Sequence, residues 1–108
     1  MLEWEAGYST IYFSKYLGKS AKWFAIEHDK IWFKRIEQLA RMRGNKIVLY
    51  HIPPNNFPWT GPHGDGSFLD LRNYVTFAED LGTKFDLILI DGRARKHCLA
   101  VAAKILNH

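Results

Sequence analysis

The chain has 108 residues, of which 47% are hydrophobic and 24% charged, and its formal net charge is +4 at pH 7. This balance is typical of one folded domain and excludes a disordered or low-complexity segment. The single cysteine excludes a disulfide scaffold and a cysteine-based zinc module. The sequence shows neither a signal peptide nor an apolar run of about 18 residues. It therefore predicts a cytoplasmic protein that does not enter a membrane.

The basic bias is weak, with fifteen lysine and arginine residues against eleven acids. One basic group, between residues 34 and 46, fits the solvated face of a helix. A second group follows a predicted strand and consists of Arg93, Arg95, Lys96 and His97. Only the net charge supports the interpretation of the chain as a nucleic-acid-binding domain, so we do not expect a nucleic-acid partner.

Hydrophobic periodicity and turn residues predict alternating helices and strands along the chain. The predicted helices cover 9–17, 29–43, 68–81 and 94–106. The predicted strands are a strand end before the first loop, then 22–28, 46–52 and 84–91. All four prolines fall in 53–66, which predicts a long loop. Ser9 or Thr10 is expected to cap the first helix and Asp29 the second, which Gly44 ends.

Strands separated by helices imply right-handed crossovers, and therefore a parallel sheet with helices on both faces. We expect an α/β fold of about four strands in a single domain over residues 1–108. Ligands of such sheets bind beyond the carboxyl ends of the strands. The segments to examine are therefore 3–10, 27–29, 51–54 and 91–95.

Both ends of the chain are short for such a sheet. Only Met1 and Leu2 precede the first loop, too few for a central strand, and the chain stops directly after the last predicted helix. That helix carries an apolar face of Leu99, Ala102, Ala103 and Leu106. We expect either a fragment of a larger domain or a homo-oligomer, most simply a dimer, that covers this face.

The first loop reads Glu3-Trp4-Glu5-Ala6-Gly7-Tyr8-Ser9-Thr10. An acid, a glycine and then a capped helix form the outline of a nucleotide-binding turn. The pattern is not G-x-G-x-x-G, so a dinucleotide pyrophosphate is poorly served. A plain strand-to-helix turn is the alternative explanation.

Acids also follow two later strands. Glu27 stands about 20 residues after the glycine turn, where a carboxylate can accept both hydroxyls of a ribose. Asp91 precedes Gly92, and Arg93 and Arg95 could hold an anionic group. The alternatives are a helix cap at 27–29, and an ion pair or cap formed by Asp91.

These three motifs together, Leu-Glu-x-x-x-Gly-x-Ser-Thr, Glu-His-Asp and Phe-Asp-Leu-Ile-Leu-Ile-Asp-Gly-Arg-x-Arg, resemble class I S-adenosylmethionine-dependent methyltransferases. The resemblance implies a Rossmann-like three-layer fold with strand order 3-2-1-4. It implies that Glu3 and Gly7 hold the methionine part of the cofactor and that Glu27 holds the ribose. Asp91 would lie near the sulfonium and the methyl acceptor, as the catalytic residue.

The residues next to these motif positions complete the predicted site. Glu5, Ser9 and His28 are expected to border the cofactor, and Arg93 and Arg95 to bind a small-molecule acceptor. S-adenosylmethionine carries a sulfonium and an ammonium group but no phosphate, so carboxylates suit it. Glu5 stands where the family has its first glycine. We expect it either to crowd the cofactor or to bind its ammonium group.

A metal site is not predicted, because the histidines and the cysteine show no pairs at metal-ligand spacing. Asp91 could bind a divalent ion, but Arg93 beside it argues against that. The predicted function is methyl transfer from S-adenosylmethionine, or the cofactor-binding part of such an enzyme. The alternative is a non-catalytic, degenerate module that acts through self-association or partner binding.

Overall fold

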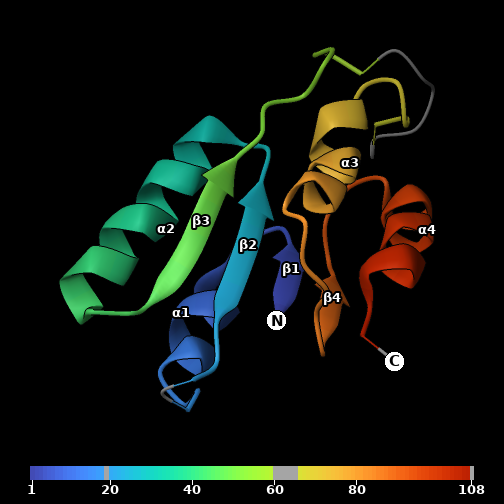
Figure 1. Ribbon diagram of the computed structural model, residues 1–108. Coiled ribbons are helices and arrows are strands. Elements are labelled where there is room, and N and C mark those ends of the chain that lie inside the picture. The colour runs from blue at the N-terminus through green and yellow to red at the C-terminus, as the bar shows by residue number, and fades with distance from the viewer. Residues whose placement is uncertain (19, 60–65, 108) are drawn as a thin grey trace.

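The computed structural model describes residues 1–18, 20–59 and 66–107. Its core is one sheet of four parallel strands in the order β3-β2-β1-β4 (Figure 1). The strands are β1 (Leu2–Trp4), β2 (Trp23–Glu27), β3 (Ile47–His51) and β4 (Ile88–Ile90). This order and the helices between the strands confirm the predicted α/β, Rossmann-like fold.

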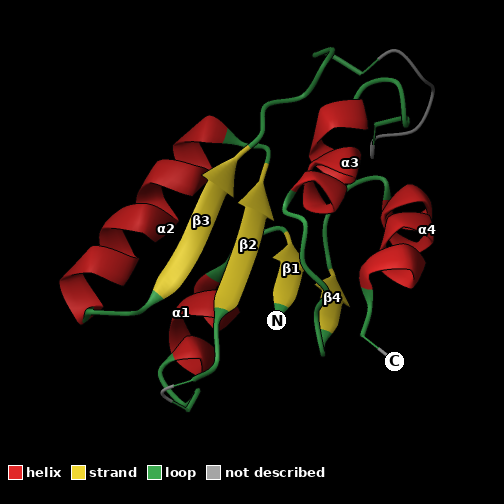
Figure 2. Ribbon diagram, viewed as in Figure 1, coloured by secondary structure: helices red, strands yellow, loops and turns green. Residues whose placement is uncertain are grey.

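Helices cover both faces of the sheet, in pairs (Figure 2). They are α1 (Tyr8–Ser14), α2 (Lys30–Arg43), α3 (Arg72–Asp80) and α4 (Arg95–Ile105). One buried cluster joins Leu2, Trp4 and Ile26 of the sheet to α3 and α4, and a second joins Trp23 and Ala25 to α1 and α2. The two clusters lie on opposite faces because successive side chains of a strand point in opposite directions. The fold therefore has the three layers expected.

The expectation that the chain starts too late for a central strand is wrong. β1 has only three residues, all buried, and it pairs with β2 on one side and β4 on the other. Neighbouring backbone extends the pairing, since Phe24 N–H donates to the Met1 carbonyl and Leu2 N–H to the Leu87 carbonyl. The Trp4 indole N–H also donates to the Tyr74 carbonyl at 3.1 Å and ties β1 to α3.

The second helix begins and ends as its sequence predicts. The Asp29 carboxylate accepts the Trp32 N–H at 2.9 Å, and Gly44 ends the helix with a left-handed φ of 68°. The first helix is capped differently from the prediction. Gly7 is its N-cap residue, and its N–H donates to the Thr10 hydroxyl, which lies inside the helix.

The third helix begins at Arg72 rather than at 68. The Asp70 carboxylate accepts hydrogen bonds from the backbone and the hydroxyl of Ser67, both at 3.0 Å. This local turn competes with helical hydrogen bonding and delays the helix. The part of the predicted loop over 53–66 that the structure describes contains no helix or strand, and 60–65 lie outside the described residues.

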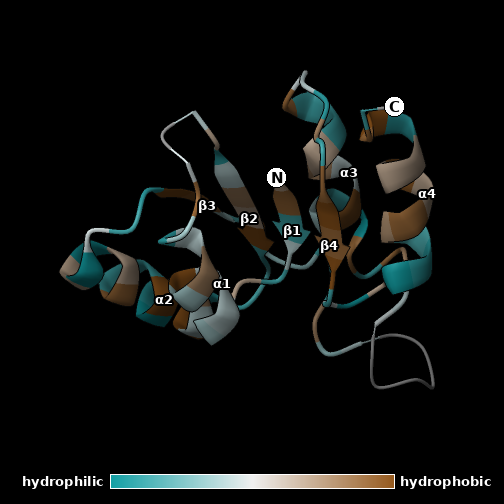
Figure 3. Cartoon of the chain, turned by 90° about the horizontal axis from the view of Figure 1, so that it is seen from below, coloured by the Kyte–Doolittle hydropathy of each residue, from teal (hydrophilic) through white to brown (hydrophobic). Residues whose placement is uncertain are grey.

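The last strand is shorter than the predicted 84–91. Phe85 is buried but pairs with Leu106, after α4, instead of with β1. Its N–H donates to the Ile105 carbonyl, and its carbonyl accepts the Asn107 N–H. β4 forms one edge of the described sheet, as a hydrophobic strand beside α4 (Figure 3). No helix among the described residues has the length and apolar character that crossing a membrane requires.

Candidate functional site

Two cavities open where β1 and β4 end, and both are bordered by Glu5 and Asp91. The first, here called the acidic cavity, measures about 520 Å³ and is also lined by Glu3, Gly7, Ser9 and Trp32. The second, the basic cavity, measures about 580 Å³ and is lined by Gly66 and the segment 91–97. The site therefore lies at the carboxyl edge of the sheet, as a parallel α/β fold predicts.

Glu3 lies within β1 and is almost fully buried, at 4% exposure. Its Oε1 accepts hydrogen bonds from the Thr10 hydroxyl and from the Trp23 indole, the latter at 3.0 Å. Burial raises the pKa of Glu3, and these two hydrogen bonds oppose the rise. Glu3 thus ties α1 to β2 and also borders the acidic cavity.

Glu27 ends β2 and is fully buried. Its Oε1 accepts the Ala6 N–H at 3.1 Å and its Oε2 accepts the Asp29 N–H at 2.9 Å. Burial raises the pKa of Glu27 to about 7, although the Asp29 amide opposes the rise. The carboxylate therefore holds the first loop to the end of β2, and it lines neither cavity in the described structure.

Glu5 follows β1 with a φ of 78°, a left-handed conformation that favours glycine. The Glu5 carboxylate, the Glu27 carboxylate and the His28 ring form one group. Each offers an oxygen or nitrogen atom that could bind a metal ion, and these atoms lie within 4.8 Å of one another. Burial raises the pKa of Glu5, and the charge of Arg93 opposes this. Glu5 thus combines a strained backbone with a side chain that occupies the mouth of the site.

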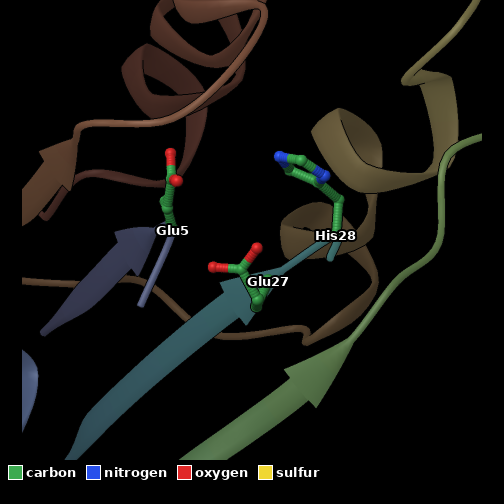
Figure 4. A group of neighbouring side chains, drawn as sticks. All are labelled: Glu5, Glu27 and His28. Carbon is green, nitrogen blue, oxygen red and sulfur yellow. The ribbon is translucent and has the colours of Figure 1, made fainter. Parts of the chain in front are cut away.

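His28 points its imidazole toward Glu5, above the end of β2 (Figure 4). The ring packs edge-on against Tyr74, with 5.2 Å between ring centroids, and against Trp59 at 6.2 Å. Among the described residues, Nε2 of His28 is buried without a hydrogen-bond partner. Burial and the charge of Arg93 lower the pKa of His28, so the neutral ring is favoured.

Tyr74 and Gly92 fit together beside this group. Tyr74 is fully buried, and within the described structure its hydroxyl makes no hydrogen bond of good geometry. A Cβ on Gly92 would lie 2.2 Å from that hydroxyl oxygen and 3.0 Å from the Glu5 Cβ. Burial raises the pKa of Tyr74 above its usual range, while the Arg93 amide opposes the rise. Only glycine fits at position 92.

Asp91 is exposed and forms an ion pair with Arg95, with 3.2 Å between Oδ1 and Nη2. The ion pair considered from the sequence is therefore present, and Ala94 rather than Asp91 is the N-cap residue of α4. Arg93 and Arg95 both line the basic cavity. The structure thus brings the predicted acceptor-binding arginines next to Asp91.

The remaining predicted residues, Gly7 and Ser9, line the acidic cavity. A Cβ on Gly7 would meet no described atom within 4 Å, so the space over this backbone is open to a ligand. Sequence reasoning missed Trp32, because its helical spacing within 29–43 is typical of a core residue. Its indole N–H donates to the Ala6 carbonyl at 2.6 Å and its ring borders the acidic cavity.

Tyr74 and Gly92 were also missed as a pair. Gly92 belongs to a recognised motif, but Tyr74 lies on a helix far away in the sequence and has no local signal. The comparisons with known proteins give no further guidance. No family model, no curated protein and no solved structure matches the chain.

Proposed function

We propose that this protein binds S-adenosylmethionine at the carboxyl edge of its sheet and transfers the methyl group to a small anionic acceptor. The observation that carries the proposal is the convergence of acids from adjacent strands. Glu3 and Asp91 border the acidic cavity, and Glu27 ends the strand between β1 and β3. A cofactor with a sulfonium and an ammonium group is favoured by such negative charge.

The two cavities suit the two substrates of a methyl transfer. The cofactor would occupy the acidic cavity, where open space over Gly7 allows its backbone to be approached closely. The acceptor would occupy the basic cavity, held by Arg93 and Arg95. Asp91 borders both cavities, where the methyl group would pass between them. Alignment of acceptor, methyl group and sulfur would supply much of the acceleration.

Glu5 decides whether the cofactor reaches Glu27. Glu27 is fully buried and grouped with Glu5, so a ribose can bind it only after the Glu5 side chain moves. Glu5 was expected either to crowd the cofactor or to bind its ammonium group. Its left-handed φ of 78° and its close approach to Gly92 favour crowding of the cofactor.

Calorimetry with S-adenosylmethionine and its demethylated product tests the proposal. Glu27→Ala should weaken binding by about 1.5–3 kcal/mol, or roughly 10- to 150-fold, the range for hydrogen bonds to a charged group. Glu37→Ala, at a partly exposed position of α2 that lines neither cavity, is the matched control and should bind as the wild type. Far-UV circular dichroism checks that both variants fold. An absence of binding to both the wild type and Glu5→Gly would refute the proposal.

A specific surface favours the alternative function, a non-catalytic module that self-associates. An apolar groove of about 480 Å³ runs between β4 and α4, lined mainly by Leu87, Ile88, Ile90, Leu99 and Leu106. Leu99 is 64% exposed and Leu87 52% exposed. A second copy of the chain packed here would cover this surface. Unchanged association in the presence of saturating cofactor, with no turnover of any acceptor, would support this alternative.

A further inference from the structure

We propose that Glu5, Glu27 and His28 bind a divalent transition-metal cation of the zinc type. Metal ligation was not expected, because the spacing argument considers residues that are close in the chain. The fold instead brings Glu5 from the end of β1 beside Glu27 and His28 from the end of β2 (Figure 4). Their ligand atoms lie within 4.8 Å of one another.

This geometry is close to that of a bound cation. Zinc binds histidine nitrogen and carboxylate oxygen at about 2.0–2.2 Å, which puts neighbouring ligand atoms roughly 3.4 Å apart. The group must therefore contract by at most about 1.4 Å between any two ligand atoms. Glu5 can supply this movement, because its side chain is partly exposed at the mouth of the two cavities.

Two of the three ligands are already held in place. The Ala6 and Asp29 amides each donate to one oxygen of Glu27 and leave further lone pairs on the carboxylate. The His28 ring is packed against Tyr74 and Trp59. Such outer contacts orient metal ligands and lower the cost of binding.

Unmet polar atoms are an independent sign of a missing ligand. His28 Nε2 is buried without a hydrogen-bond partner among the described residues, although a neutral ring nitrogen is a good metal ligand. Tyr74 is 0% exposed and its hydroxyl also lacks a well-formed hydrogen bond in the described structure. Three protein ligands leave a fourth zinc position for a water molecule.

The ligand set selects the class of cation. Imidazole suits zinc, copper, iron and nickel, whereas magnesium and calcium prefer oxygen alone. When both carboxyl groups have released their protons, the two carboxylates and the neutral imidazole carry a charge of about −2, which a divalent cation offsets. The charge of Arg93, which acts on both Glu5 and His28, opposes this attraction.

The cation site goes beyond the proposed function and does not rest on it. The cation and a cofactor ribose would both need Glu27, so they should compete for it. The two ideas are tested separately: zinc titrations contain no cofactor, and cofactor titrations contain a chelator.

Calorimetric titration of the whole chain with ZnCl₂, after treatment with EDTA and buffer exchange, tests the proposal. We expect one equivalent of zinc to bind. Glu5→Gln and His28→Gln should each weaken binding at least about 10-fold, because losing even an outer partner of a metal ligand costs 10- to 100-fold. Glu37, a partly exposed residue of α2 that lines neither cavity, provides the matched control Glu37→Gln, which should leave zinc binding unchanged.

Cobalt provides a second measurement, because its visible absorption reports on its ligands. The wild type and Glu37→Gln should give the same cobalt spectrum, and His28→Gln should give a different one. Equal zinc affinity in the wild type, Glu5→Gln and His28→Gln would overturn the proposal. So would an absence of zinc binding to the folded wild type.

Discussion

The buried carboxylate of Glu27 should make the stability of this protein depend on pH. Burial raises its pKa from an ordinary value of 4.5 to about 7 in the folded state. Between these values the unfolded chain has lost the proton while the folded chain keeps it. Rising pH therefore favours unfolding, by about 1.4 kcal/mol per pH unit over this window. The stabilising effect of the proton is complete below pH 4.5 and is lost as pH rises through 7.

The expected magnitude follows from these two pKa values. Between pH 5 and pH 8, Glu27 should lower the free energy of unfolding by about 2.5 kcal/mol. Burial raises the pKa of Glu3 and Glu5 as well, which adds a change of the same sign. The lowered pKa of His28 has the opposite effect, because its unfolded form takes up a proton below about pH 6.5.

Glu27→Gln separates the effect of Glu27 from the others. Glutamine does not titrate, so the pH profile of the variant should lack the 2.5 kcal/mol fall while keeping the contributions of Glu3, Glu5 and His28. Its amide must face the backbone N–H of Ala6 or Asp29, which lowers stability by about 1–3 kcal/mol at every pH. The difference in slope is therefore the informative quantity, and the constant offset is not.

Urea unfolding followed by tryptophan fluorescence, in buffers from pH 5 to pH 8 that contain EDTA, measures both profiles. Glu37→Gln, which removes a partly exposed carboxylate on α2, should follow the wild-type profile and serves as the control. Parallel profiles for the wild type and Glu27→Gln would show that Glu27 is ionised in the folded protein throughout this range. The burial argument would then be wrong.

Three further changes test the site and the exposed face. Glu5→Gly should raise the free energy of unfolding by about 1 kcal/mol, because glycine adopts a φ of 78° without strain. It should also tighten cofactor binding, because it removes the side chain that crowds the site. Weaker cofactor binding in calorimetry would instead make Glu5 a ligand. Gly92→Ala should cost roughly 1–3 kcal/mol in urea unfolding, because its Cβ would lie 2.2 Å from the Tyr74 hydroxyl. Adding Tyr74→Phe should recover much of that loss, and no recovery would place the clash elsewhere. Light scattering at micromolar concentration should give a mass greater than that of one chain, because Leu87 and Leu99 are exposed on one face. Leu99→Glu should lower the measured mass to that of one chain. A wild-type monomer with a cooperative melt would contradict self-association.

Local sequence patterns were sufficient for the layers of the fold. Apolar strands alternating with helical periods specify a parallel sheet, because a crossover helix is the short connection between parallel strands. The cap at Asp29 and the left-handed turn at Gly44 were predictable for the same reason. Each depends on hydrogen bonds within a few residues. The positions of Glu27 and Asp91 at the carboxyl edge of the sheet were also predictable, because Glu27 ends β2 and Asp91 follows β4, whereas Glu3 lies inside β1.

Only the tertiary structure decided what these residues contact. The sequence places Glu5 in the first loop, but it does not indicate that Glu5 lies beside a buried Glu27. It gives no sign that Tyr74, on α3, places its hydroxyl against Gly92 after β4. Nor does it show that Phe85 pairs beside the end of α4 and shortens the last strand. These contacts join segments far apart in the chain, so they follow from how the layers pack and not from the propensity of any one segment.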